Sequence, residues 1–186
     1  MGASMGTDVR DRVVLLDDHD RPVGHADRND VHGPHTPRHL AFSCYLFDAG
    51  GRVLLTRRAL GKATWPGVWT NSCCGHPRPG EGGETAVRRR VAEELGVAVE
   101  DLELVLPDFG YRAVDASGIV ENEACPVWVG RLSGILAPDP AEVAETSWVA
   151  WPDVVAVARN VPALLSPWAA LQVPLLDDLR VAGGAA

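Results

Sequence analysis

The chain has 186 residues, a formal net charge of −8, 46% hydrophobic residues and 23% charged residues. These values are ordinary for one globular domain with a substantial core, and the negative charge argues against sequence-independent nucleic-acid binding, which needs a basic face. The longest nearly apolar run, residues 164–176, contains Pro167, Gln172 and Pro174, so it is too short and too broken to span a bilayer.

The N-terminus and the cysteines indicate a cytoplasmic location. No apolar stretch typical of a secretory signal opens the chain, and thiols stay reduced in the cytoplasm. No two cysteines have CxxC spacing, which disfavours a structural zinc knuckle. We expect a cytoplasmic monomer without nucleic-acid or membrane partners. Its expected parts are a disordered leader at 1–10, one domain at 11–180 with its core at about 38–172, and a tail at 181–186.

The first part of the chain predicts short strands separated by turns. The run HLAFSCYLF is almost continuously apolar, which indicates one buried strand. Asp48-Ala49-Gly50-Gly51 is typical of a hairpin turn. In order, the expected elements are a strand at 13–16, a turn at 17–24, a histidine-rich loop at 24–39, a strand at 39–47, the hairpin turn and a strand at 52–58.

A glycine- and proline-rich loop followed by a helix occupies residues 71–97. The loop residues cannot form a regular element, and from Glu84 the apolar residues Val87, Val91 and Leu95 recur every four positions. This spacing predicts a helix with one buried stripe, ended by Gly96. The pairs 89/93 and 90/94 join Arg to Glu at i,i+4. Composition alone favours exposed ion pairs worth about 0.3–0.5 kcal/mol each.

The second half predicts further strands and two helices. The expected elements are a strand pair within 102–113, a strand at 119–131, a strand at 147–150, a helix from Pro152 through Ala158 and a C-terminal helix capped by Ser166-Pro167. Pro174 predicts a kink or break in that last helix. Glu121 and Glu123 share one strand face, where two carboxylates are costly to bury unless they bind a cation or share a proton.

The spacing of the loop and helix resembles the Nudix box. The matching positions are Gly75, Glu81, Arg89-Arg90, Glu93-Glu94 and Gly96. In Nudix proteins this loop and helix hold Mg²⁺ against a diphosphate, which suits hard oxygen ligands. Nudix hydrolases have Arg-Glu where this chain has Arg89-Arg90. The missing carboxylate argues against pyrophosphate hydrolysis, and the added cation suits holding a diphosphate intact.

Longer motifs resemble the type 1 isopentenyl-diphosphate Δ-isomerases, a Nudix-fold family of isoprenoid biosynthesis. The motifs are HLAFS at 39–43, TRRAL at 56–60, WPGVWTNS at 65–72, CGHP at 74–77, YRA at 111–113, GIVENEACPV at 118–127 and SPW at 166–168. The resemblance covers most of the chain and implies a single-domain α/β fold, a Nudix α/β/α sandwich with a mixed β-sheet. It also implies interconversion of isopentenyl diphosphate and dimethylallyl diphosphate through a tertiary carbocation.

The same resemblance assigns the site residue by residue. Cys74 and Glu123 match the two proton-transfer residues, Tyr111 supports the acid side by hydrogen bonding, and Trp168 offers its π face to the cation. One Mn²⁺, Zn²⁺ or Fe²⁺ is implied at a site of imidazoles and carboxylates, which suits these metals. Its implied ligands are His32, His39, His76, Glu121 and Glu123, while Mg²⁺ is held by Glu94 with the substrate diphosphate, and the diphosphate clamp is Arg28, Arg58, Lys62 and Arg90.

Two other classes of function stay open. A Nudix pyrophosphohydrolase of a nucleotide derivative would share the fold and the Glu93-Glu94 pair, but Arg90 and the pair Cys74 and Glu123 argue against it. A non-catalytic binding module on the same scaffold would not need Cys74 and Glu123 together. Either of these two residues is the acid in a given direction of the reaction. Cys73 is a small buried residue or the partner of Cys74 in a vicinal disulfide.

Overall fold

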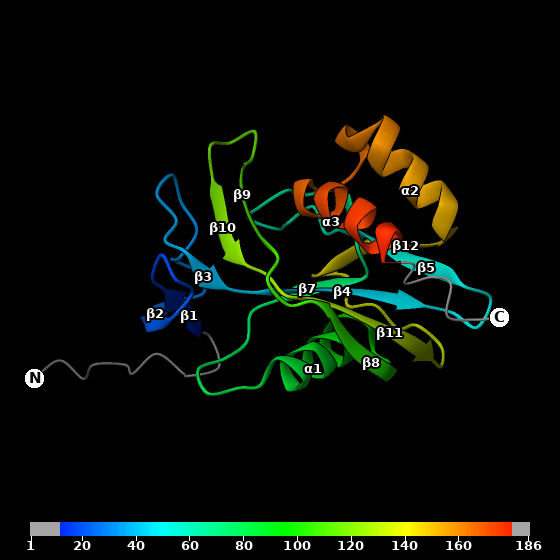
Figure 1. Ribbon diagram of the computed structural model, residues 1–186, viewed down its shortest axis with the longest axis horizontal. Coiled ribbons are helices and arrows are strands. Elements are labelled where there is room, and N and C mark those ends of the chain that lie inside the picture. The colour runs from blue at the N-terminus through cyan, green and yellow to red at the C-terminus, as the bar shows by residue number, and fades with distance from the viewer. Residues whose placement is uncertain (1–11, 180–186) are drawn as a thin grey trace, which may run out of the picture.

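The computed structural model describes residues 12–179, so the expected leader and tail lie outside the described residues (Figure 1). The described chain forms a five-stranded sheet, a seven-stranded sheet and three α-helices. The elements are β1 (Arg12–Leu16), β2 (Pro22–Asp27), β3 (His39–Leu40), β4 (Phe42–Phe47), β5 (Arg52–Arg58), β6 (Trp69–Thr70), β7 (Cys73–Gly75), α1 (Gly83–Leu95), β8 (Ala98–Leu106), β9 (Gly110–Val114), β10 (Val120–Ala124), β11 (Val127–Ser133), β12 (Val143–Ala150), α2 (Trp151–Asn160), a 3-10 turn η2 (Pro162–Leu164) and α3 (Pro167–Asp178).

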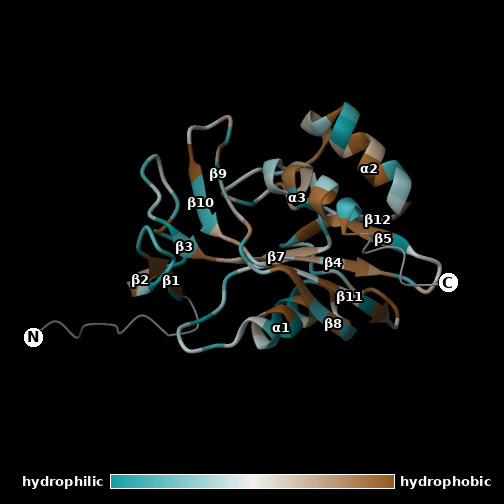
Figure 2. Ribbon diagram, in the orientation of Figure 1, coloured by the Kyte–Doolittle hydropathy of each residue, from teal (hydrophilic) through white to brown (hydrophobic). Residues whose placement is uncertain are grey.

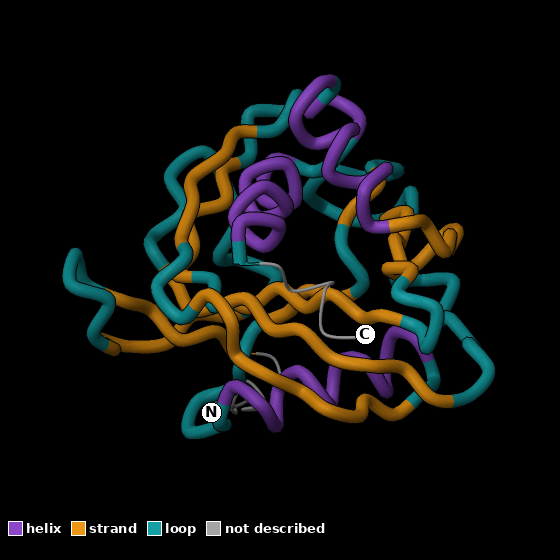
Figure 3. Tube along the Cα trace, turned by 45° about the vertical axis from the view of Figure 1, so that its right-hand side comes forward, coloured by secondary structure: helices purple, strands orange, loops and turns teal. Residues whose placement is uncertain are grey.

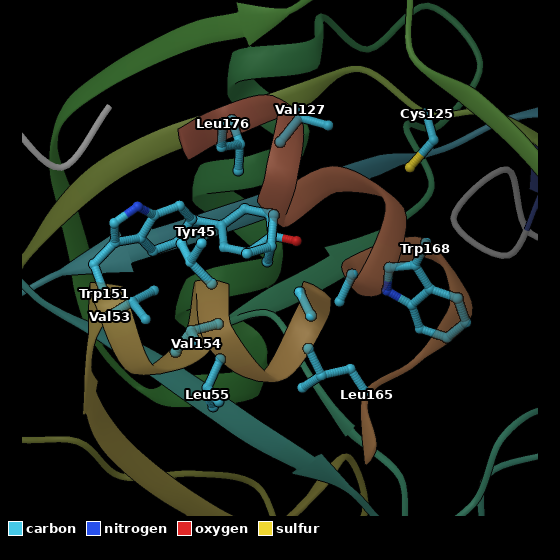
Figure 4. Close-up of a cluster of buried hydrophobic side chains, with 14 of the residues drawn as sticks. Tyr45, Val53, Leu55, Cys125, Val127, Trp151, Val154, Leu165, Trp168 and Leu176 are labelled. Atoms are coloured by element: carbon cyan, nitrogen blue, oxygen red, sulfur yellow. The ribbon is translucent and has the colours of Figure 1, made fainter. Parts of the chain in front are cut away.

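The larger sheet lies between two helical layers, with α1 on one side and α2 and α3 on the other (Figure 3). Its strand order is β12-β5-β4-β11-β8, with β6 beside β5 and β7 beside β4. β4 is buried along its length and mostly hydrophobic (Figure 2). Leu46 packs with Val87, Val91 and Leu95 of α1, and Tyr45 packs with α2 and α3 (Figure 4). The expected α/β/α sandwich and the buried stripe of α1 are therefore confirmed.

The chain crosses twice from the five-stranded sheet to the seven-stranded sheet, once between β3 and β4 and once between β10 and β11. β3 pairs in parallel with β10 in the five-stranded sheet, and β4 pairs in parallel with β11 in the seven-stranded sheet. Pro126, which has no N–H to donate to a ladder, separates β10 from β11, while the Ala41 N–H donates to the Ala124 carbonyl across the crossing at 2.8 Å. The predictions of one strand at 39–47 and one at 119–131 are therefore wrong, because each range forms two strands in different sheets.

Two further expectations need correction. The loop predicted at 24–39 begins later, because β2 continues to Asp27 in antiparallel pairing with β1. α3 runs through Pro174 without the expected break, since its fully buried neighbours Val173 and Leu176 hold it against the core although proline removes one helical hydrogen bond. Ser166 caps α3 as predicted, accepting the Ala169 N–H on its side chain. None of the helices within residues 12–179 has the length and apolar character needed to cross a bilayer.

Candidate active site

A cavity of about 450 Å³ lies where the crossing strands join the two sheets. Residues from both sheets, from α1 and α3 and from the loops around them line it. All predicted site residues except His39 and Arg90 are in its wall. Those in the wall are Arg28, His32, Arg58, Lys62, Cys74, His76, Glu94, Tyr111, Glu121, Glu123 and Trp168.

Three histidines and one glutamate converge at this cavity, with His39 just behind the wall. His32 comes from the loop after β2, His39 from β3, His76 from the residue after β7 and Glu123 from β10, and one ligand atom of each lies within 4.8 Å of the others. The Nε2 atoms of His76 and His39 lie 3.2 and 3.4 Å from Glu123 Oε1. The His39 Nδ1–H donates to the Pro37 carbonyl at 2.9 Å, which leaves the Nε2 lone pair free for a ligand.

The donor set fits a divalent metal. Three ring nitrogens in the cluster, His32 Nε2, His39 Nε2 and His76 Nδ1, are buried without a hydrogen-bond partner. Buried polar atoms are normally satisfied. The unpartnered Nε2 atoms of His32 and His39 belong to residues whose ligand atoms lie within 4.8 Å of one another, which indicates that a ligand belongs there. Three imidazoles and a carboxylate suit Zn²⁺, Mn²⁺ or Fe²⁺.

Burial and the Glu123 charge determine the protonation of the cluster. Burial lowers the pKa of His32 to about 4, with a further lowering by His76 and His39, and burial also lowers the pKa of His76. For His39, burial alone would lower the pKa, but the contact with Glu123 outweighs burial, so the pKa is raised. Burial would raise the pKa of Glu123, yet the His39 and His76 contacts hold it well below its usual range. Two of the three imidazoles are thus kept neutral, as metal ligands must be.

Glu121 has different surroundings from Glu123 on the same strand. Its Oε1 accepts the Thr64 hydroxyl at 2.7 Å, and its Oε2 accepts the Tyr111 hydroxyl. Glu121 is not among the four residues whose ligand atoms converge. Burial and the neighbouring Glu123 charge raise its pKa. The two carboxylates therefore differ: the pKa of Glu123 is lowered and the pKa of Glu121 is raised.

Cys74 and Cys73 face opposite sides of β7, as successive strand residues do. Both residues contribute to the cavity lining. Burial raises the pKa of the Cys74 thiol to about 12, so it carries its proton at neutral pH. The Cys73 thiol is buried toward α1 and lies 3.4 Å from Glu94 Oε2. Among the described residues all cysteines are free thiols, and the alternative of a vicinal disulfide is not supported.

Trp168 forms an aromatic wall at the start of α3. Its ring centroid lies 5.5 Å from that of Trp65 and 5.6 Å from that of Tyr111. The Arg58 guanidinium carbon lies 5.5 Å from the Trp168 centroid. Only 2% of Trp168 is exposed, so its neighbours hold the ring in place where it lines the cavity.

Cations and carboxylates alternate at the side of the cavity next to α1. Arg90 pairs with Glu94 one turn further along the helix, and its guanidinium also lies 2.9 Å from Glu93 and 3.3 Å from Glu142. Lys62 pairs with Glu142 as well, and burial lowers its pKa to about 8. The Arg90–Glu94 pair is buried on both sides, so the interpretation of this pair as an exposed ion pair is wrong.

Comparisons with known proteins agree with this geometry. Residues 37–171 match the NUDIX domain. The chain is 61% identical over 171 residues to isopentenyl-diphosphate Delta-isomerase of Mycolicibacterium vanbaalenii, covering 92% of this chain and 94% of that protein. The same-named protein of Frankia alni is 57% identical over 190 residues, 98% of each chain. The chain belongs to the isopentenyl-diphosphate Delta-isomerase family. The solved structure of DR0079 from Deinococcus radiodurans, 22% identical, matches with a TM-score of 0.67 over 88% of this chain and 97% of that one, which supports the Nudix fold alone.

For this family member, the structure adds site residues that the sequence motifs did not single out. Thr64 bonds to Glu121, and Glu142 bridges the cations Lys62 and Arg90. Ser43 and Asn71 both lie within hydrogen-bonding distance of the Cys74 sulfur. Ser43 and Asn71 lie inside the quoted motifs, but nothing in local spacing distinguishes a buried polar residue that supports a site from one that supports only the fold.

Proposed function

We propose that this chain interconverts isopentenyl diphosphate and dimethylallyl diphosphate, the activity that the relatives' name describes for them. One observation carries the proposal: a cysteine thiol and a glutamate carboxylate, Cys74 and Glu123, line one cavity together with the Trp168 ring and several cations. A thiol and a carboxylate that line one cavity suit proton transfer to and from carbon.

The reaction needs two proton transfers and no oxidant or co-substrate. A proton adds to the terminal methylene carbon of the alkene, which leaves a tertiary carbocation, and a proton then leaves the methylene on the other side as the new double bond forms. Cys74 and Glu123 perform these two transfers, and the reverse reaction exchanges their roles. Tyr111, whose hydroxyl donates a hydrogen bond to Glu121, supports the acid side of the pocket.

The carbocation needs stabilisation without a nucleophile that could trap it. The Trp168 ring presents a π face, an interaction worth about 2 kcal/mol or more when desolvated. Tyr111 and Trp65 pack against the same ring and hold it in place. Their packing also keeps water, which would convert the cation to an alcohol, away from the reacting carbons.

We propose two divalent ions in the working enzyme. One is Mn²⁺, Zn²⁺ or Fe²⁺ at the histidine cluster, and when bound it supplies a charge that orients Glu123 and tunes its proton affinity. The other is Mg²⁺ held by Glu94 and the substrate diphosphate. The ligands of the first ion are His32, His39, His76 and Glu123, with Glu121 joining them in place of its present partners.

Four basic residues hold the diphosphate, and three of them, Arg28, Arg58 and Lys62, line the cavity. Guanidinium groups suit bidentate contacts with phosphate, and a lysine adds a point charge. Lys62 and Arg90 both pair with the Glu142 carboxylate. The proposed clamp consists of Arg28, Arg58, Lys62 and Arg90.

The proposed function is tested with purified protein, isopentenyl diphosphate and Mg²⁺, with Mn²⁺ or Zn²⁺ supplied separately. Proton NMR should show dimethylallyl diphosphate forming, and the same final ratio of isomers should be reached from either compound. Release of pyrophosphate or phosphate from nucleoside diphosphate derivatives, without isomerisation, would instead favour the hydrolase alternative.

A further inference from the structure

Asn71 is a fully buried polar residue in the turn between β6 and β7, where it contacts both sides of the proposed reaction site. Its Oδ1 lies 3.2 Å from the Cys74 sulfur and 2.9 Å from Trp168 Nε1. A third donor, the Thr70 hydroxyl, lies 2.8 Å from the same oxygen. One carbonyl oxygen thus receives a thiol, an indole and a hydroxyl, three groups from two separate segments of the chain.

The orientation of the Asn71 amide follows from its partners. The Nδ2 group donates to the carbonyls of Cys44 and Cys73 at 3.1 and 2.8 Å, and carbonyls only accept. The indole N–H only donates, so Oδ1 must face Trp168. Both amide hydrogens and the oxygen are used, which fixes the side chain in one position.

The Thr70 contact ties Asn71 to the start of α3. The Thr70 Oγ1 lies 2.7 Å from the Ser166 hydroxyl, and Ser166 is the N-cap of the helix that carries Trp168. Since Thr70 gives its one hydroxyl proton to Asn71, Ser166 donates to Thr70. Trp168 is therefore held twice: directly through its indole N–H and indirectly through the cap of its helix.

We infer that Asn71 is a positioning residue whose single Oδ1 orients both the Cys74 thiol and the Trp168 ring. The inference rests on the proposed function, in which these two groups act on the same allylic unit. As an acceptor, Oδ1 takes the S–H proton and holds the thiol in one rotamer. Ser43, whose Oγ already accepts from Gln172 at 3.0 Å, offers its own proton to the Cys74 or Cys125 sulfur.

The variants separate the oxygen of Asn71 from its NH₂ group. Asn71→Ala removes both, whereas Asn71→Asp keeps an accepting oxygen and loses the paired donors to Cys44 and Cys73. Ser72→Ala is the matched control: Ser72 is equally buried and bonds the Leu46 N–H and the Leu54 carbonyl, and none of its hydrogen bonds reaches Cys74 or Trp168.

For Asn71→Ala we expect kcat to fall by about 10- to 100-fold, the effect of small misplacement of reacting groups, with KM close to that of wild type because the cationic clamp is untouched. Asn71→Asp should recover part of kcat, and Ser72→Ala should retain it. A kcat near wild type in Asn71→Ala would overturn the inference. Equal losses in Asn71→Ala and Asn71→Asp would also overturn it, because they would show that only the NH₂ group matters.

Two spectroscopic measurements decide the inference without catalysis. The Cys74 S–H Raman band, isolated by subtracting the Cys74→Ala spectrum, should lie at the low frequency of a hydrogen-bonded thiol. It should move up in Asn71→Ala but not in Asn71→Asp or Ser72→Ala. The Trp168 indole N–H signal in NMR, assigned by its absence in Trp168→Phe, should move upfield in Asn71→Ala.

These spectra separate the two proposals. If wild-type protein and Ser72→Ala convert no isopentenyl diphosphate, the proposed function fails, and the spectra still decide whether Asn71 holds both groups. If Asn71→Ala does not fold, the wild-type difference spectrum against Cys74→Ala remains a test. A Cys74 band at the frequency of a free thiol would then overturn the inference.

Discussion

His39 and Glu123 are register partners in the parallel strands β3 and β10, and His39 Nε2 lies 3.4 Å from Glu123 Oε1. Sheet pairing itself therefore brings two of the candidate metal ligands together. The other two, His32 and His76, come from the chain after β2 and after β7. A site built around a strand pair is more rigid than one built on loops alone, which suits a metal that must orient one carboxylate.

Removing His39 should remove the metal. His39→Ala deletes a buried ligand from the sheet, so we expect loss of the stoichiometric Mn²⁺, Zn²⁺ or Fe²⁺ measured by inductively coupled plasma mass spectrometry. His25→Ala, which deletes an exposed histidine of β2, is the control and should retain the metal. Glu121→Gln should weaken binding if Glu121 joins the ligands as proposed. Full metal content in His39→Ala would contradict the site.

Metal affinity should fall in mild acid, with His39 as the main proton competitor. Its raised pKa means that protonated His39 beside Glu123 stabilises the metal-free fold below the unfolded value of 6.5, and that this contribution is lost as pH rises through the folded pKa. A metal ion displaces that proton, so affinity increases with pH. His32, with a pKa of about 4, is already neutral at pH 6.

Calorimetric titration of the metal-free protein in buffers of different ionisation enthalpy measures the protons released. Near pH 6 we expect about one proton per ion from the imidazoles, because only His39 has a raised pKa, and Glu121, whose pKa is also raised, adds at most one more as it joins the ligands. Release of about three protons from Glu121→Gln, which lacks that carboxyl, would show that all the histidines are charged before binding, contrary to their burial. Affinity that does not change between pH 5 and pH 7 would contradict His39 as a ligand.

Much of this architecture could be predicted from the sequence, because helices and their caps depend on residues that are close together in the chain. The stripe Val87, Val91 and Leu95 and the cap Ser166 lie where they were expected. The division of the strand at 39–47 was not predicted, because apolar content does not reveal that a strand leaves one sheet for another. That transition depends on a partner more than 80 residues away, the chain around Pro126.

The site likewise could be predicted where short motifs contain its residues, but not where it depends on contacts between distant parts of the chain. Motif positions place His76, Cys74 and Glu123 at one cavity together with His32, and His39 lies beside them in the histidine cluster. The support residues Thr64 and Glu142 lie outside the quoted motifs and are recognised only by their contacts. The burial of Arg90 and Glu94 was also missed, since an i,i+4 ion pair has the same spacing whether it faces water or the protein interior.

Arg90 should be essential for stability as well as for diphosphate binding. Arg90→Ala leaves the buried Glu94 without its cation and removes a partner from Glu142, so we expect the free energy of unfolding to fall by about 3–5 kcal/mol. Urea denaturation measures this loss. The control Glu84→Gln weakens an exposed pair with Arg88 on the same helix and should change stability by less than about 1 kcal/mol. Similar values for both variants would contradict a buried role for Arg90.

The last prediction separates the adjacent cysteines 73 and 74. Cys74→Ala should keep the fold and the metal, because a small side chain beside an open cavity is removed. It should lower turnover by about 10²- to 10⁴-fold, as expected for loss of a general acid or base. Cys73→Ala is the control from the same strand: its thiol faces Glu94 and α1, so we expect a mild effect on turnover.

Isotope exchange shows whether the lost activity is proton transfer. In D₂O, wild-type protein and Cys73→Ala should place deuterium at the carbon of isopentenyl diphosphate that becomes a methyl group, since the proton donor exchanges with solvent between turnovers. Cys74→Ala should place none there within the time of a wild-type assay. Near wild-type turnover of Cys74→Ala with deuterium still entering the product would assign the transfer to another group, and Tyr111, whose hydroxyl bonds to Glu121 in the same wall, would then be the residue to test.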